Sequence, residues 1–185
     1  TMGETRLQLD LEKYVGGSRL KLVTDLLYDP IADFYDIELE RGRGWLDLRE
    51  ANVTFSPARF ADVRAGRQIL TWGTGNFLFL NDLFPKDWNS FFIGRDVEYL
   101  KAPSDAVKVS LFSRLANLDV VYMPRFDADR YVDGRRLSYW NPQLQRRAGR
   151  DAIVEPDRPN EWFGDEEWAA RLHRTVGGYE LAAYA

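Results

Sequence analysis

The feature of this sequence that most constrains its fold is an alternation of apolar and polar residues with a period of two. Successive side chains of a β-strand point to opposite faces of a sheet, so each alternating segment predicts a strand with one apolar and one polar face. In the clearest example, Ala106 to Pro124, the alternation runs, turns at 113–117 and runs again. Eight such segments are present, at residues 6–12, 19–28, 45–55, 63–72, 106–111, 118–122, 168–172 and 179–183.

In two of these predicted strands the alternation of apolar and polar residues is interrupted. In the third, Leu46 and Leu48 have the opposite parity from the apolar residues that follow, and one extra residue near Arg49-Glu50, a β-bulge, would restore the pattern. In the fourth, Arg67 shares the parity of apolar residues, and Gly66 permits the close approach of a bulky neighbour. We therefore expect local irregularities in both strands.

The connections between the predicted strands alternate strictly in length. Short ones lie near residues 13–17, 56–61, 113–117 and 174–178, and long ones near residues 29–44, 73–104 and 125–167. In an up-and-down antiparallel sheet this order gathers the short turns at one end and the long loops at the other. Outer-membrane β-barrels have this plan, with short periplasmic turns and long extracellular loops.

The polar parity of the strands carries many charges, and such a face needs water or bonding partners. A transmembrane barrel supplies water in its lumen and turns its apolar face to lipid, whereas a soluble lipocalin-like barrel turns its polar face outward and encloses an apolar interior. Periodicity alone leaves both open. The residues of the polar parity are Arg6, Asp10, Arg19, Asp25, Arg64, Gln68, Lys108, Asp119, Arg171 and Glu180.

Composition narrows the class of protein. The chain of 185 residues is long enough for one domain with a sizeable core. It contains no run of about 18 consecutive apolar residues, which argues against a helical membrane protein. A mean hydropathy of -0.43 does not argue against a barrel, because barrel strands give every second residue to the lumen. Aromatic residues make up 14% of the chain, which suits a β-rich fold or the aromatic girdles at a membrane boundary.

Several kinds of site are absent from the sequence. The chain has no cysteine and a single histidine, His173, which excludes thiolate chemistry and a histidine-rich metal site within the chain. A net charge of -4 gives no overall support to non-specific nucleic-acid binding. No Gly-x-Ser-x-Gly motif is present. Asp82, Asp87, Asp96 and Glu98 offer oxygen ligands to calcium but lack EF-hand spacing. We predict no enzyme, no cofactor and no metal site.

Four short motifs carry a resemblance to a known group of proteins: Arg49-Glu50-Ala51, Gly66-Arg67-Gln68, Trp72-Gly73 and Asn81 to Pro85. Together they resemble Gram-negative outer-membrane porin-like proteins related to alginate-export and phosphate-selective porins. The similarity is best from about Leu46 to Pro124. It implies an all-β fold, an up-and-down antiparallel transmembrane β-barrel of which about eight strands are visible. Because such porins are considerably longer, it also implies that residues 1–185 are a single domain forming the N-terminal part of a wider barrel.

The resulting hypothesis is a channel of the bacterial outer membrane that passes small polar or charged solutes through a charged lumen. Its partners would be the lipid bilayer, lipopolysaccharide and a small solute, and a homo-oligomer is compatible with it. The alternative is a soluble or periplasmic barrel that binds an apolar ligand. The candidates for lining the lumen are Arg19, Lys21, Arg64, Gln68, Lys108, Asp119, Arg171 and His173.

Arginine supplies 20 of the 25 basic residues. Its planar fork matches carboxylates and phosphates, so an arginine-rich wall would favour anionic solutes. The competing interpretation is that the arginines pair with Asp and Glu and brace the lumen.

Overall fold

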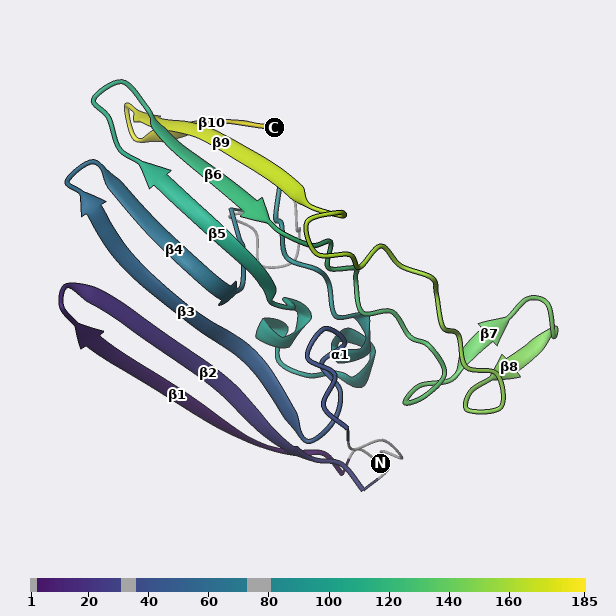
Figure 1. Cartoon of the computed structure of the whole chain (residues 1–185). Coiled ribbons are helices and arrows are strands. Elements are labelled where there is room, and N and C mark those ends of the chain that lie inside the picture. The colour runs from purple at the N-terminus through teal and green to yellow at the C-terminus, as the bar shows by residue number, and fades with distance from the viewer. Residues whose placement is uncertain (1–2, 31–35, 73–80) are drawn as a thin grey trace.

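The computed structural model describes residues 3–30, 36–72 and 81–185, which form one large antiparallel sheet with long connections at one end (Figure 1). The sheet has eight strands in the order β1-β2-β3-β4-β5-β6-β9-β10, so every strand pairs with its neighbour in sequence, apart from the small hairpin β7–β8 inserted before β9. Its strands are β1 (Thr5–Val15), β2 (Ser18–Tyr28), β3 (Leu46–Ala58), β4 (Ala61–Gln68), β5 (Ser104–Leu111), β6 (Asn117–Met123), β9 (Glu167–Val176) and β10 (Tyr179–Tyr184).

The all-β, up-and-down prediction is confirmed. Each of the eight alternating segments overlaps a strand of the sheet, and short turns follow β1, β3, β5 and β9 while long connections follow β2, β4 and β6. In Figure 1 the short turns gather at one end of the sheet and the long connections at the other. The sheet is open: β1 and β10 form its two edges and do not pair with each other in the described part of the chain.

Both predicted irregularities are present. Val23 pairs with Glu50 and Thr24 with Leu48, which leaves Arg49 as the extra residue of a bulge. At Gly66 the backbone has φ 114, and a Cβ atom there would lie 2.4 Å from the carbonyl oxygen of Ala51. The close neighbour of Gly66 is therefore the backbone of β3 rather than a bulky side chain.

The long connections contain structure that the alternation did not predict. The fourth strand ends at Gln68 rather than at Trp72. After Gln68 the chain leaves the sheet, and Leu70 and Trp72 pack against residues of β5, β6 and β9. The connection from β4 to β5 contains a helix, α1 (Trp88–Ile93), and a 3-10 helix, η1 (Val97–Leu100), and the connection from β6 to β9 contains a hairpin, β7 (Tyr139–Asn141) and β8 (Arg146–Ala148). None of the helices in the described residues is long and apolar enough to cross a membrane.

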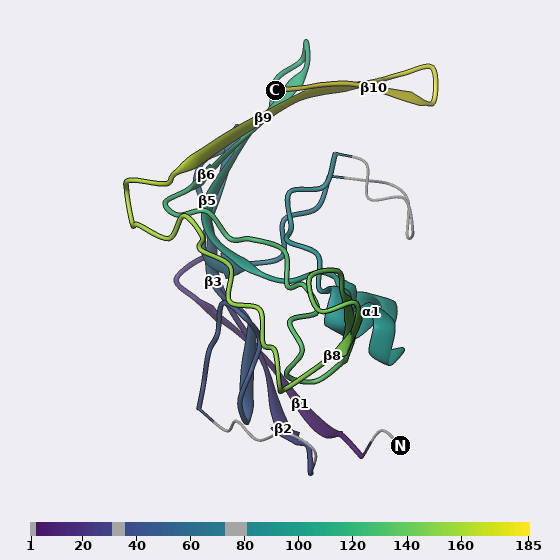
Figure 2. The ribbon, with the colours of Figure 1, turned by 90° about the vertical axis from the view of Figure 1, so that its right-hand side faces the viewer.

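The sheet is curved, and α1 lies on its concave side (Figure 2). The apolar parity faces the convex side and stays uncovered: Leu11 is 58% exposed and Val107 is 37% exposed. The polar parity faces the concave side, where Asp25 and Asp119 are buried. The usual distribution of a soluble sheet, with its apolar face packed on a core, is thus reversed.

A small apolar core lies on the concave side. Leu70 and Trp72, which follow β4, pack with Ala106, Val121, Met123 and Ala169 from β5, β6 and β9, and Leu83 joins them. This cluster seals one part of the concave face, and charged residues occupy much of the rest.

Candidate functional site

All eight residues predicted to line a lumen lie on the concave face of the sheet. The pairing register joins Arg64 to Lys108 across β4 and β5 and Asp119 to Arg171 across β6 and β9. Gln68 is fully buried, and its side-chain amide donates to the carbonyl oxygen of Ala106 at 3.0 Å, so it ties β4 to β5 and does not contact open space. The remaining three of the eight predicted residues are Arg19, Lys21 and His173, which lie on the same face.

Ion pairs between strands hold the part of this face that lies toward the short turns. Glu50 pairs with Lys21 at 2.8 Å and also with Arg64, so one carboxylate bridges β2, β3 and β4. The nitrogen atoms of His173 lie 3.9 Å from Asp119 and from Glu180. These contacts agree with the interpretation that the charges brace the wall. The other pairs are Lys108–Asp119 at 3.7 Å, Arg19–Glu12 at 3.9 Å and Arg171–Glu180.

Toward the long connections, the concave face is covered by residues 81–103, here called the docked segment, which contains α1 and η1. Arg49, the bulge residue of β3, donates from Nη2 to the carbonyl oxygens of Glu98 at 2.7 Å and Lys101 at 3.0 Å. The ring of Tyr99 packs under the guanidinium groups of Arg6 and Arg49, at 4.4 and 4.9 Å. The docked segment is therefore attached to the wall through arginines of β1 and β3.

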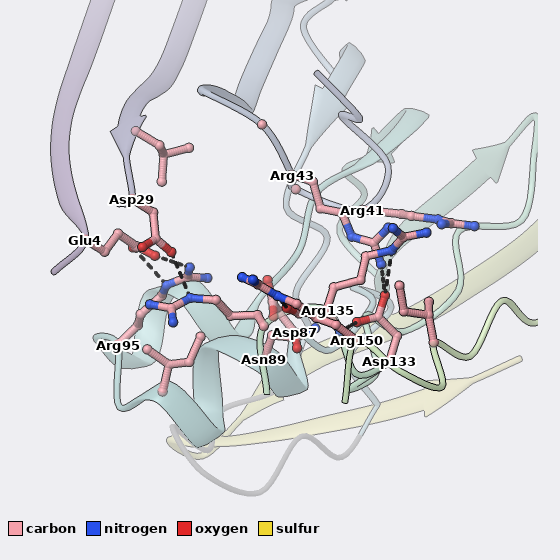
Figure 3. Close-up of a pocket in the computed structure, with 16 residues that line it drawn as sticks. Glu4, Asp29, Arg41, Arg43, Asp87, Asn89, Arg95, Asp133, Arg135 and Arg150 are labelled. Atoms are coloured by element: carbon pink, nitrogen blue, oxygen red, sulfur yellow. Dashed lines mark hydrogen bonds and ion pairs between the residues drawn. The ribbon is translucent and has the colours of Figure 1, made fainter. Parts of the chain in front are cut away.

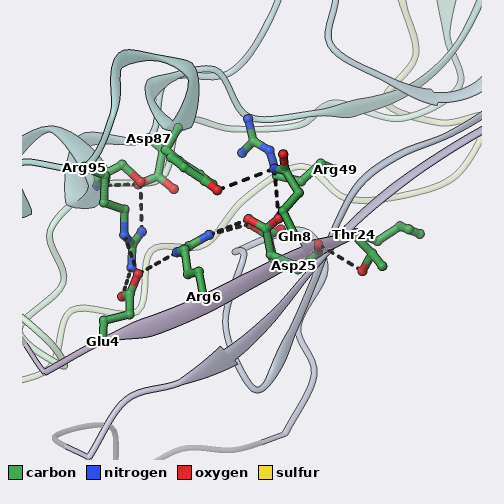
Figure 4. Close-up of polar contacts among 12 residues, drawn as sticks. Glu4, Arg6, Gln8, Thr24, Asp25, Arg49, Asp87 and Arg95 are labelled. Carbon is green, nitrogen blue, oxygen red and sulfur yellow. Dashed lines mark hydrogen bonds and ion pairs between the residues drawn. The ribbon is translucent and has the colours of Figure 1, made fainter. Parts of the chain in front are cut away.

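Two carboxylates lie beneath the docked segment. Asp25 and Asp47 are paired across β2 and β3, and their exposed fractions are 0% and 2%. Arg6 Nη1 lies 2.9 Å from Asp25 and 3.9 Å from Asp47, and the amide of Gln8 donates to Asp25 at 3.0 Å (Figure 4). Buried carboxylates require such partners, because an unpaired charge out of water is strongly destabilising.

Arg130 joins three connections at one point. It is 3% exposed, lies 3.3 Å from Asp87 at the start of α1, and donates to the carbonyl oxygens of Leu39 and Glu40, each at 3.1 Å. The guanidinium fits there because residue 42 is glycine: a Cβ atom on Gly42 would lie 2.1 Å from Arg130 Nη1. The connections after β2, β4 and β6 are thus held together by one buried cation.

Beside this junction, at the end of the sheet where the long connections lie, is a cavity of about 400 Å³ (Figure 3). We call it the arginine cavity, because its lining contains six arginines and four carboxylates. Glu4 accepts from Arg95 Nε at 3.1 Å, Arg43 pairs with Asp133, and Asp29 lies 2.8 Å from Arg136. The charged residues of the lining are Glu4, Asp29, Arg41, Arg43, Asp87, Arg95, Asp133, Arg135, Arg136 and Arg150.

Burial and charge shift the pKa values of two groups in this cavity. Burial by itself would raise the pKa of Glu4, but hydrogen bonds from Arg95 and Arg6 and their positive charges outweigh it, so this pKa lies below its ordinary value. Burial lowers the pKa of the Arg43 guanidinium, although Asp133 and Glu38 partly offset that effect. Glu4 is therefore held ionised by its two arginines.

Three of the four acidic residues considered for calcium, all but Glu98, have structural roles. Asp87 caps α1 by accepting from the backbone N–H of Ser90 at 2.8 Å, and Asp96 caps η1 by accepting from the N–H of Glu98 at 3.2 Å. Asp82 accepts from the backbone N–H of Trp72 at 3.0 Å. Within residues 3–30, 36–72 and 81–185, no group of three or more His, Cys, Asp or Glu side chains is arranged to hold a metal ion.

Comparisons of the chain with family models, with curated proteins and with solved structures found no match. The candidate site consequently stands on its own geometry. Sequence reasoning missed the arginine cavity, whose lining comes from Glu4 just before β1, the end of β2 and the long connections. The available signal was the run of arginines between residues 135 and 150, in which no acidic residue occurs.

Proposed function

We propose that this chain forms part of the wall of an outer-membrane channel that passes small polar or charged solutes. The observation that carries the proposal is the reversal of the two faces: the convex side of the sheet is apolar and bare, and the concave side is charged and partly covered. An uncovered apolar face is stable in contact with lipid, and a charged face is stable in a water-filled lumen.

Aromatic residues stand at both ends of the convex face, which further supports the proposal. At the long-connection end, the rings of Tyr122 and Trp168 pack together at a tilt of 40°, with centroids 4.5 Å apart. At the short-turn end, Phe55 is 37% exposed and Tyr179 is 77% exposed. Tyr and Trp are enriched at the two boundaries of a membrane, and aromatic girdles flank the apolar band of outer-membrane barrels.

In this proposal the sheet belongs to a transmembrane β-barrel, with the short turns in the periplasm and the long connections outside the cell, in contact with lipopolysaccharide. The edges β1 and β10 would pair with further strands, because unpaired backbone groups are not tolerated in lipid. The docked segment narrows the lumen, and solutes are selected by the width of the remaining passage and by the charge of its wall.

The rival hypothesis, a soluble barrel that binds an apolar ligand, needs the opposite arrangement of faces. The apolar cluster on the concave side offers it little support, because Leu70, Trp72 and Val121 there pack against one another and are almost fully buried. A detergent-free, monodisperse preparation that takes up a hydrophobic dye would favour the binder over the channel.

The test is conductance of the full-length protein, with the strands that complete the barrel, in planar lipid bilayers, with two matched variants. Lys108 lies on the concave face and Arg174 on the convex face, and Lys108→Gln and Arg174→Gln remove the same charge. Lys108→Gln should lower the permeability of anions relative to cations, whereas Arg174→Gln should leave the reversal potential unchanged. Folded, vesicle-inserted protein that adds no conductance to a bilayer would contradict the proposal.

A further inference from the structure

We infer that the arginine cavity binds a small organic carboxylate that has an apolar body, and that it does so at the outer mouth of the proposed channel. The binding claim stands on the cavity itself, and only its role in solute passage rests on the proposed function. The volume of the arginine cavity, about 400 Å³, lies within the range of small-molecule sites.

The charge of the lining points to an anion. Three of its four carboxylates are tied to lining arginines: Glu4 to Arg95, Asp29 to Arg136, and Asp133 to Arg43. The fourth, Asp87, is tied to the buried Arg130, which lies outside the lining. The carboxylates of the lining are thus already paired, and six guanidinium groups face four acids there, with Arg135 also paired to Glu155 from outside the lining.

Arg41 is one of these guanidinium groups, and its ion pair is long. Its closest carboxylate is Glu38, one turn of chain away, at 3.7 Å from Nε, and both side chains are partly exposed to water. A guanidinium carries five N–H donors in a planar fork that matches a carboxylate with two parallel hydrogen bonds. Arg41 therefore has donors to offer a ligand, and it lies within the chain reversal that the Glu38–Arg43 bridge closes.

Apolar side chains argue for a ligand that is more than an inorganic anion. Leu27 from the end of β2, Ile93 from the end of α1 and Ile153 from the connection after β8 contribute to the same lining. Burying an apolar body against these side chains adds favourable free energy that a phosphate or a sulfate ion cannot gain. The combination of an anion and an apolar body is what separates this site from a general anion surface.

The experiment measures binding of benzoate to the folded chain by titration calorimetry, together with three related probes. Acetate keeps the carboxylate and lacks the ring, benzyl alcohol keeps the ring and lacks the charge, and inorganic phosphate is an anion without an apolar body. We expect benzoate to bind about tenfold or more tightly than each of the three. Equal affinity for benzoate and benzyl alcohol, or for benzoate and phosphate, would overturn the inference.

Variants locate the binding. Arg41→Ala should weaken benzoate binding about tenfold, and Arg147→Ala is the matched control, because Arg147 is an exposed arginine of β8 outside the lining. Ile153→Ala should weaken benzoate while leaving acetate within about twofold. A loss with Arg147→Ala equal to that with Arg41→Ala would show a nonspecific charge effect and overturn the inference.

The result also separates the two proposals. Benzoate binding without conductance would refute the channel and leave the binding site intact. Conductance without benzoate binding would refute the site and leave the channel intact.

Discussion

The two faces of β5 offer the sharpest test of the membrane proposal, because adjacent residues there point to opposite sides. Val109 is on the convex face, with Val63 and Val120 as its Cα partners. Ser110 is on the concave face, and its partners are Asp62 and Asp119. The perturbation is the same new side chain at each position, Val109→Arg and Ser110→Arg.

The expected cost follows from the depth of Val109. It lies one to two residues from the middle of β5 (Ser104–Leu111). At a rise of about 3.4 Å per residue and a tilt of about 45°, this places it about 4 Å from the bilayer midplane, if the middle of the strand marks that plane. An arginine on the lipid face costs about 2–4 kcal/mol at the midplane and about 0–1 kcal/mol near the interface. We therefore expect Val109→Arg to lower the free energy of unfolding by about 2 kcal/mol.

Ser110→Arg should cost about 1 kcal/mol or less, because the new cation can pair with Asp62 and Asp119 although it replaces the hydroxyl that donates to Asp119. The assay is reversible unfolding in guanidinium from lipid vesicles, followed by tryptophan fluorescence. If the convex face meets water instead, Val109→Arg is an ordinary surface substitution with an effect within about 0.5 kcal/mol. Equal costs for the two variants in vesicles would refute the assignment of the faces.

Three further outcomes are expected. Gly66→Ala should destabilise the fold by about 1–3 kcal/mol, since it places a Cβ atom 2.4 Å from the carbonyl oxygen of Ala51 at positive φ, and chemical denaturation measures this. Arg49→Ala should loosen the docked segment by removing the side-chain donor from two part-buried carbonyl oxygens, at a cost of about 1 kcal/mol, and limited proteolysis should then cut within that segment faster than in the wild type. The pKa of Glu4 lies below its unfolded value of 4.5, so its pairing with Arg95 stabilises the fold above about pH 4.5 and is lost as the pH falls through the folded pKa; Glu4→Gln should abolish this component of acid unfolding.

The pairing order and the composition of each face follow from local sequence. Alternation fixes which side chains share a face, because the period of a strand is two residues, and short turns force consecutive strands to pair. The bulge at Arg49 could also be predicted from the sequence, because one extra residue shifts the parity of Leu46 and Leu48 relative to the rest of β3. Eight of the eight lumen candidates lie on one face for this reason.

The long connections could not be derived in the same way. The positions of Arg49 and Arg130 depend on backbone carbonyls of Glu98 and Leu39, which are far away in the sequence and carry no pattern. The docked segment has no sustained alternation, so neither its helices nor its contact with the wall was predictable. Gln68 shares the polar parity and yet is fully buried, because the strand next to it and the chain after β4 close over it.

The sequence by itself determined a meander of amphipathic strands with short turns at one end, because periodicity and turn length are local properties of the sequence. Only the tertiary structure decided that the charged side is the concave one, that three connections converge on the buried Arg130, and that six arginines enclose a cavity. The physical reason is that period-two patterning is symmetric between the two sides of a sheet. Curvature and the long-range pairing of buried charges break that symmetry, and both arise only when distant segments meet.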